Sequence, residues 1–499
     1  MKLPGTLSTI VIKKKRKTLL AELTRGNALL LVIVLGIGAN FQSGYHATAL
    51  SSPTPFIKHF INSSWYERYE ETPPSEKVRM IWSLIVSSYP VGGLFGSWSF
   101  KFIAGNLGRK KGVICGSCIS IIAAIIMLTS KISKSFEMII IARLLFGLGC
   151  CLHLTYLTEI SPKNIRGRVT LTYSNFFSLG KVIGGLLGLS EIFGTEDLWI
   201  VALTFPACFL VAHVVVFPFF PESPRYLFIE KGDEEACRKA LQSLWGPGDY
   251  RQEMDEMLVE QAAIEAAHPK TPLQLMKDRT VRWQLVTAVC IFLFNNLSGM
   301  FVIHNFSFVI FMGAGIPEDK IRYISLGLLM CEVIVSMSTS LLIDRFGRRP
   351  LICGGFGAMC CGWVLVTVLL NLKVILDLLF QSSVTRILVD TGAATSPLIG
   401  ELFVQSDRLA AFVIIGMLGC LGMAVLGFAF PFLIIYLGSY SFVLFACVCL
   451  LASLYTFFIV PETKGKTMLE IAEEFKAITK FFWDPCGTVA PLCLSPPRV

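Results

Sequence analysis

Residues 108–110 read Gly-Arg-Lys, and residues 347–349, 239 positions later, read Gly-Arg-Arg. Two further patterns recur at nearly the same interval. They are Glu159 with Arg166 against Glu401 with Arg408, and Pro221-Glu222-Ser223 against Pro461-Glu462-Thr463. Three matches in one order and at nearly one spacing indicate a duplicated unit. The sequence therefore predicts a fold of two related halves.

The composition places both halves in a lipid bilayer. Hydrophobic residues make up 54% of the 499 residues and charged residues only 16%, and the mean hydropathy is +0.65. Apolar runs of about 18 residues or more recur along the chain, which is enough to cross the hydrocarbon core. Backbone groups in such runs must bond internally, so each run should be a helix. The alternating pattern of a membrane β-barrel is absent. We predict an all-α membrane protein.

Twelve transmembrane helices are expected, six in each half. The spans lie near 27–48, 79–101, 112–130, 136–157, 169–191, 198–219, 281–312, 320–343, 350–370, 374–400, 409–434 and 438–460. The corresponding domains are a tail (1–26), an N-terminal half (27–219), a linker (220–280), a C-terminal half (281–460) and a second tail (461–499). The linker is charged and rich in glutamate, which predicts a small cytoplasmic helical bundle.

The distribution of basic residues orients the spans. The block Lys13–Lys17 precedes the first span, so the N-terminus is expected in the cytoplasm. An even number of spans then places the C-terminus there too. The same count puts residues 49–78 outside, where Asn62-Ser63-Ser64 forms a glycosylation sequon. A plasma-membrane glycoprotein is the expectation.

Other function classes find no support in the chain. The formal charge of +9 sits in turns and tails, as topology requires, and predicts no nucleic-acid partner. The sixteen cysteines lie nearly all within apolar runs, and no CxxC pair is flanked by His or Cys at metal spacing. No metal, cofactor or enzymatic activity is predicted.

Charged residues gather at the predicted cytoplasmic ends of the spans, at matched places in both halves. Positive-inside topology explains basic turns but not the paired acids. We therefore predict a salt-bridge network that joins the halves on the cytoplasmic side. Its predicted members are Arg109, Arg143, Glu159, Arg166, Glu222, Arg225, Arg348, Arg349, Glu401, Arg408 and Glu462.

These motifs resemble those of the sugar porters of the major facilitator superfamily. The likeness runs from about residue 25 to 475 and is carried most specifically by Pro-Glu-Ser-Pro-Arg (221–225) and Pro-Glu-Thr-Lys-Gly-Lys-Thr (461–467). Within solute carrier family 2 the chain resembles class II, the fructose/glucose branch, and Glu332 resembles the member-eleven group. The resemblance implies a major facilitator fold and passive alternating-access transport of a hexose. The cytoplasmic network would then hold the outward-open state.

A hexose calls for neutral amides and hydroxyls in the middle of the membrane. Asn295, Asn296, Ser298 and Asn305 surround Gly299 in the seventh span, and at 100° per residue three of them share a face. Gly299 could let that helix bend. Further candidate residues are Gln42 and Ser43 of the first span and Ser174 and Ser178 of the fifth. His304 is either a sugar contact or a packed polar residue.

Several positions depart from the family pattern, and they leave alternatives open. The family has glutamines at 295 and 296, and Lys181 lies inside the fifth span, where a charge needs a partner or water. Lys181 and Glu332 could pair across the halves. A uniporter of glucose, fructose or both is the leading hypothesis. The alternatives are a polyol or organic-anion carrier, the anion drawn by Lys181, and a non-transporting receptor or scaffold. Proton symport is less favoured, since the first span has no Asp or Glu.

Overall fold

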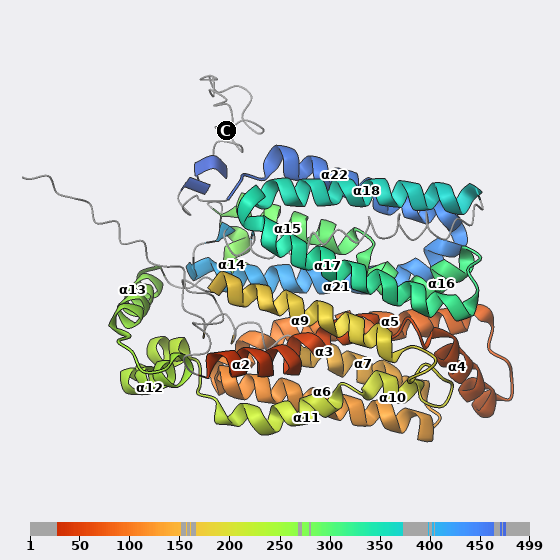
Figure 1. The fold of residues 1–499 in the computed structure, drawn as a ribbon, viewed down its shortest axis with the longest axis horizontal. Helices are drawn as coiled ribbons and strands as arrows, with labels where there is room; N and C mark the ends of the chain where they lie inside the picture. The colour runs from red at the N-terminus through yellow and green to blue at the C-terminus, as the bar shows by residue number, and fades with distance from the viewer. Residues whose placement is uncertain are drawn as a thin grey trace, which may run out of the picture.

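A computed structural model describes residues 27–150, 166–267, 272–278, 281–372 and 405–463, together with residues 156, 160, 398, 402, 403, 470, 471 and 473–475. Every regular element in this part of the chain is a helix, which agrees with the all-α prediction. The long helices run side by side in one bundle (Figure 1).

The helices fall into two sets with a linker between them. The first set, the N-half, contains α2 (Ala28–Leu35), η1 (Gly36–Asn40), α3 (Phe41–Thr48), α4 (Thr54–Tyr69), α5 (Ser75–Leu107), α6 (Arg109–Ile132), α7 (Phe136–Cys150), α9 (Arg166–Leu187), α10 (Trp199–Thr204), α11 (Ala207–Val216) and η2 (Phe217–Phe219). The linker contains η3 (Tyr226–Glu230), α12 (Glu234–Trp245), α13 (Arg251–Ala267) and α14 (Pro272–Lys277). The second set, the C-half, contains α15 (Arg282–Leu297), α16 (Met300–Gly313), α17 (Glu318–Phe346), α18 (Arg348–Leu372), α21 (Gln405–Leu437), η4 (Gly438–Tyr440) and α22 (Ser441–Ile459).

The helices have the length and composition of membrane spans. Within the described ranges, eight helical segments are long and apolar enough to cross a bilayer, and the last, Ala410–Ile459, covers both α21 and α22. The spans expected near 136–157 and 169–191 correspond to α7 and α9. The span expected near 374–400 lies outside the described residues except for Leu398.

Figure 1 shows α12 and α13 at one end of the bundle and α4 at the other. We call these the α12 end and the α4 end. The helices of the N-half lie together on one side, and those of the C-half lie on the other. Between them α9 contacts α17, α5 contacts α21, and α3 contacts α16, so these pairs form the interface of the halves.

Glycine pairs bring the helices of the N-half into close contact. A Cβ atom on Gly44 of α3 would lie 1.9 Å from the carbonyl oxygen of Phe177, and one on Gly180 of α9 would lie 2.1 Å from that of Phe41. Gly92 of α5 and Gly147 of α7 form a second reciprocal pair, since a Cβ atom added to either would lie 1.9 Å from a carbonyl oxygen of the other helix. Small residues allow this backbone approach, which is how helices associate where lipid removes the hydrophobic driving force.

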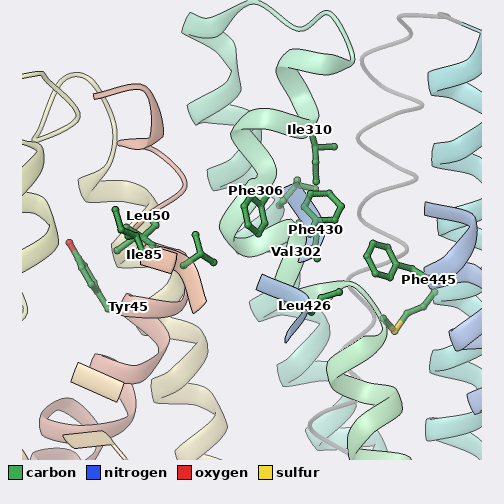
Figure 2. Packing of buried hydrophobic residues seen from close by; sticks show 14 of the residues in the cluster. Tyr45, Leu50, Ile85, Val302, Phe306, Ile310, Leu426, Phe430 and Phe445 are labelled. Atoms are coloured by element: carbon green, nitrogen blue, oxygen red, sulfur yellow. The ribbon is translucent and has the colours of Figure 1, made fainter. Parts of the chain in front are cut away.

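One cluster of buried apolar side chains extends through both halves. In the C-half, Figure 2 shows Phe306 of α16 beside Phe430 of α21, and their ring centroids are 5.1 Å apart. Phe430 lies in turn 6.2 Å from the ring of Phe445 of α22. This packing fixes α16 against α21 and thereby sets which side chains of α16 face the N-half.

Candidate functional site

A cavity lined by both polar and apolar side chains lies between the halves near the α4 end, and we call it the interhalf cavity. The N-half contributes Thr48, Ser51 and Ser52 from the end of the first span, and α16 and α17 contribute His304, Ser307, Arg322 and Ser325. Apart from Arg322 and His304, these polar groups are hydroxyls. The cavity measures about 30 Å³, roughly the room of two water molecules. Since small-molecule pockets measure about 300–1,000 Å³, the halves lie too close together here for this cavity to hold a hexose.

Hydrogen bonds between the halves close the cavity toward the α4 end. The hydroxyls of Ser51 and Ser307 bond to each other, and Ser325 Oγ lies 3.4 Å from Ser307 Oγ. Farther out on α17, Arg322 donates to the Ser190 hydroxyl and Tyr323 donates to the Glu191 carboxylate. Three separate ties therefore hold the N-half to the C-half at this end.

Three ionisable side chains meet beside the cavity, and we call them the ion cluster. Lys181 of α9 bonds to Glu332 Oε1 of α17, and His304 Nε2 of α16 lies 2.9 Å from Glu332 Oε2. The side chains of Lys181 and His304 are each 9% exposed and that of Glu332 is 3% exposed. The cross-half pair of Lys181 and Glu332 is thus confirmed. His304 connects this pair to the cavity that it lines.

The predicted amide-and-hydroxyl face of the seventh span is wrong as a single face. Gly299 adopts φ +93° and separates α15 from α16, so counting 100° per residue fails across it. Ser298 donates its hydroxyl to the Asn295 carbonyl at 2.6 Å, and its own carbonyl accepts from Trp363 Nε1 at 2.7 Å. Ser298 is fully buried against α18 and does not face the cavity. The predicted bend at Gly299 is confirmed.

The asparagines of this span also lie elsewhere. The Asn296 amide packs against α21 at Gly419, where an added Cβ would lie 2.9 Å from Asn296 Nδ2. Asn305 is buried and donates to the Phe301 carbonyl of its own helix at 3.0 Å. Asn295 is half-buried. None of the three lines the interhalf cavity, so in this closed state only His304 of the predicted sugar site does.

Gln42 and Ser43 line a second, smaller cavity inside the N-half, of about 10 Å³. Gln42 Nε2 donates to the Pro206 carbonyl at 2.8 Å. The Tyr45 hydroxyl donates to the carbonyl of Ala202, which lies one turn before Pro206. This carbonyl lacks its helical partner because Pro206 has no N–H. The first span thus satisfies the break between α10 and α11. Gln42 thus makes a structural bond through Nε2, and its predicted role in sugar binding stays a prediction.

The fifth-span candidates are less informative. Ser178 is buried and Ser174 is half-buried on α9. Among the described residues that line the two cavities, neither serine is present. Their predicted role in sugar binding stays a prediction.

Two acids of the predicted cytoplasmic network, Glu222 and Glu462, bond to the starts of helices. Glu222 Oε1 accepts the backbone N–H of Lys110 at 2.8 Å, at the start of α6. Glu462 accepts those of Arg348 and Arg349 at 3.0 and 3.1 Å, at the start of α18. The first N–H groups of a helix have no helical partner and carry partial positive charge, so a carboxylate binds there.

The basic members bond close to these caps. The Arg109 guanidinium donates to Glu230 at 2.9 Å and lies 4.8 Å from the Tyr226 ring. Arg349 donates to the Phe457 carbonyl of α22, and Arg225 directly precedes η3. Arg166 begins α9 and Arg408 lies in the first turn of α21. The side chains of these last two, and Glu159 and Glu401 entirely, lie outside the described residues.

Arg143 was predicted at the cytoplasmic edge, and this is wrong. Its guanidinium donates to the His46 carbonyl at 3.0 Å and lies 4.9 Å from the Tyr89 ring, fully buried within the N-half. Arg143 is seven residues from the start of α7, or about 10 Å from the turn at the α4 end. Arg109 starts α6 at the opposite end. The two arginines therefore cannot join one network.

Comparison with known proteins identifies the family. A model of the sugar (and other) transporter family matches residues 31–475. The rat facilitated glucose transporter member 5 of solute carrier family 2 is 36% identical over 457 residues, which cover 89% of this chain and 91% of the relative. The human member 11 is also 36% identical, over 91% of this chain and 94% of the relative. The chain belongs to the sugar transporter family. It is an integral membrane transporter and not an enzyme.

Solved structures support the fold of this transporter. The xylose transporter XylE from E. coli, in a partially occluded inward-open conformation, superposes with a TM-score of 0.73 at 17% identity. The alignment covers 88% of this chain and 99% of XylE. The all-helical major facilitator fold is therefore confirmed.

Sequence reasoning missed the hydroxyls that line the transporter's interhalf cavity. Ser51 and Ser52 follow the last residue of the first span, and His304 and Ser307 are three residues apart on α16. That i, i+3 spacing places two polar groups on one helix face, which was a usable signal. The serines after the first span reach the cavity only through tertiary packing, which the sequence does not show.

Asn62 lies exposed on α4, on the surface at the α4 end of the transporter. The third residue of its sequon, Ser64, is buried and donates its hydroxyl to the Lys134 carbonyl. Glycosylation at Asn62 stays a prediction.

Proposed function

We propose that this transporter carries a hexose, glucose or fructose or both, by facilitative alternating access. The observation that carries the proposal is the interhalf cavity, where hydroxyls of both halves and the His304 imidazole converge. Hydroxyls both donate and accept, which suits a solute made of hydroxyls, and the Arg322 guanidinium on the same wall is a further donor. Both relatives described above are named facilitated glucose transporters, which supports the same solute class.

We further propose that the α4 end faces the exterior of the plasma membrane, with Asn62 glycosylated, and that both chain termini are cytoplasmic. In the described closed state the α4 end is sealed by the three ties between the halves. Uptake from outside requires these ties to break and the interhalf cavity to widen from about 30 Å³ to the size of a hexose site. The division into a tail, two halves, a linker and a second tail follows the same proposal.

The organic-anion alternative loses its main support. It rested on an unpaired Lys181 inside the membrane, whereas Glu332 pairs with that ammonium group. In the linker, Phe228, Cys237, Leu241 and Met257 pack on one another, so these side chains are not free to bind the partner of a receptor or scaffold.

The test is uptake of labelled glucose, fructose and urate into proteoliposomes. We expect saturable hexose uptake without a pH gradient. Ser325→Ala removes one cavity hydroxyl, and the loss of one hydrogen bond of about 1 kcal/mol should raise the half-saturation concentration roughly fivefold. Ser338→Ala is the matched control, since Ser338 is exposed on the same helix and bonds to its own Ile334 carbonyl. Uptake of urate alone, or of no solute, would contradict the proposal.

A further inference from the structure

The ion cluster places three ionisable groups from three helices in one buried position. Lys181 comes from α9 in the N-half, and His304 and Glu332 come from α16 and α17 in the C-half. The Lys181 ammonium also lies 4.9 Å from the Phe177 ring, on its own helix. The cluster is therefore a charged contact between the halves. In it one carboxylate, that of Glu332, bonds both to the Lys181 ammonium and to the His304 imidazole, which becomes a cation when protonated.

The charges balance only while His304 is neutral. The Glu332 carboxylate uses Oε1 for Lys181 and Oε2 for His304 Nε2. A neutral His304 that donates its Nε2 proton to Glu332 has an unprotonated Nδ1. A proton added at Nδ1 leaves two cations on one carboxylate, a net charge of +1. Since a buried charge is costly unless it is paired, this uncompensated positive charge favours the departure of one cation.

The surroundings decide which cation leaves. His304 and Glu332 belong to the same half, whereas Lys181 reaches across from the other half on a flexible stem. Among the described residues, the charged groups that meet at this position are Lys181 on α9, His304 on α16 and Glu332 on α17. The cavity residues of the first span, Thr48, Ser51 and Ser52, are uncharged. Arg322 also lines the cavity wall, where it bonds to Ser190.

We propose that the ion cluster is a proton-binding site, that the proton is taken up by His304 from the interhalf cavity, and that its binding releases Lys181 from Glu332. Release removes a tie between α9 and α17 and loosens the halves. The carrier then opens more readily as the pH falls. The expected effect on solute exchange rests on the proposed function, but proton binding and opening do not.

The first experiment measures labelled hexose exchange in proteoliposomes with equal pH on both sides, between about pH 5.5 and pH 8, where histidine ordinarily changes charge. We expect the rate to rise several-fold toward acid pH. His304→Gln keeps an N–H donor for Glu332 but takes up no proton, and its rate should be independent of pH. His59→Asn is the matched control, since His59 pairs with Glu196 at 3.2 Å on the exposed surface, and it should retain the response. Exchange that is independent of pH in the unaltered transporter, or an equal response in His304→Gln, would overturn the inference.

The second experiment does not depend on any solute. Ser325→Cys places a thiol on the cavity wall, and its labelling by a membrane-impermeant maleimide reports opening. Labelling at each pH is compared between this variant and the same variant carrying His304→Gln, so that the thiol's own pH dependence cancels. We expect the labelling rate of Ser325→Cys, divided by that of the same variant carrying His304→Gln, to rise several-fold toward acid pH. A ratio that stays constant would refute the proton site even if hexose is transported. A rising ratio without hexose uptake would support the site and contradict the proposed function instead.

Discussion

Glu332 bears a carboxylate in the interior of the helical bundle because two donors reach it, one from each half. Lys181 bonds to one oxygen and His304 to the other, so no lone charge is left away from water. Such a pair is costly to assemble but much costlier to break on one side, since the remaining charge stays buried without a partner. The stability of the cluster should therefore depend on both charges together.

Removing one charge of the pair should destabilise the transporter strongly. We expect Glu332→Gln and Lys181→Met each to cost about 3–5 kcal/mol, and the double variant to recover most of that loss. The measurement is thermal unfolding in detergent, followed by fluorescence. Lys239→Met is the control, because Lys239 pairs with Glu235 on the exposed face of α12, and it should leave the unfolding temperature unchanged. Equal destabilisation in the double and single variants would show that packing, not charge, explains the loss.

The sequence could predict part of this cluster. A lysine and a glutamate in separate apolar spans each need a partner, which was sufficient to suggest their pairing. It could not show that His304 shares the carboxylate, since that depends on how α16 continues after the break at Gly299. The same break separates Ser298 from the cavity. A regular helical count therefore failed where one residue adopts a positive φ.

At the scale of elements, the repeated motifs build the same helix start twice. Gly108 and Gly347 both adopt φ +90°, and each is followed by a long helix whose first N–H groups bond to Glu222 or Glu462. An added Cβ would lie 2.8 Å from the Glu222 carboxylate and 2.7 Å from that of Glu462. The glycine is thus required both by its backbone conformation and by the capping carboxylate.

Gly347→Ala should destabilise the C-half. The positive φ and the contact with Glu462 together predict a loss of about 1–3 kcal/mol. Gly354→Ala is the matched control in α18, since nothing lies within 4 Å of its added Cβ, and it should be neutral or stabilising by up to about 1 kcal/mol. The unfolding temperatures of both variants, measured in detergent, test this difference. A smaller loss for Gly347→Ala than for Gly354→Ala would contradict the capping account.

The repeats predicted these residues, and the structure shows what two of the acids bind. A carboxylate near a helix start binds the unpaired N–H groups there, which are close and already oriented. The bonds between the halves that the matched acids and bases suggested stay a prediction. Sequence spacing reveals that a motif is repeated, whereas only the fold reveals what lies nearest to it.

The reactivity of the Cys237 thiol depends on the packing of α12 against η3. Its thiol is buried with Phe228, Leu241 and Met257, and this burial, aided by Glu234 and Asp233, raises its pKa from 9.0 to about 11. Since a thiol with a raised pKa stays protonated longer, the thiolate fraction near neutral pH should fall about 100-fold. The stability gained by the neutral thiol is complete below pH 9.0 and is lost as the pH rises toward 11.

Alkylation of Cys237 should therefore be slow in the folded transporter. We expect iodoacetamide at neutral pH to modify it about 100-fold more slowly than in denatured protein, measured by mass spectrometry of the Cys237 peptide. Phe228→Ala opens the packing and should restore part of the rate. Rapid alkylation of the unaltered, folded chain would mean that α12 does not pack on η3 as described.

At the scale of the whole molecule, the two halves are closed at the α4 end by side chains that lie far apart in the sequence. Ser51 meets Ser307, Ser190 meets Arg322, and Glu191 meets Tyr323. Each contact joins the N-half to α16 or α17 beside the interhalf cavity. The proposed alternating access of a hexose requires all three to separate in each cycle, because the cavity has no room for such a solute while they hold.

Fixing one of these contacts covalently should therefore stop transport without unfolding the protein. Ser51→Cys with Ser307→Cys replaces two bonded hydroxyls with thiols, and we expect oxidation to abolish uptake and a reductant to restore it. Ser453→Cys is the control, because Ser453 Oγ lies 3.5 Å from the native Cys353 Sγ within the C-half, so a bond there ties only helices that move together. Gel mobility after proteolysis between the halves verifies the Ser51–Ser307 cross-link, and mass spectrometry of the disulfide-linked peptides verifies the control cross-link within the C-half. The prediction fails if the oxidised, cross-linked variant transports as fast as the same variant after reduction. In that case the halves do not separate at the α4 end, and this closed state is not a step of the cycle.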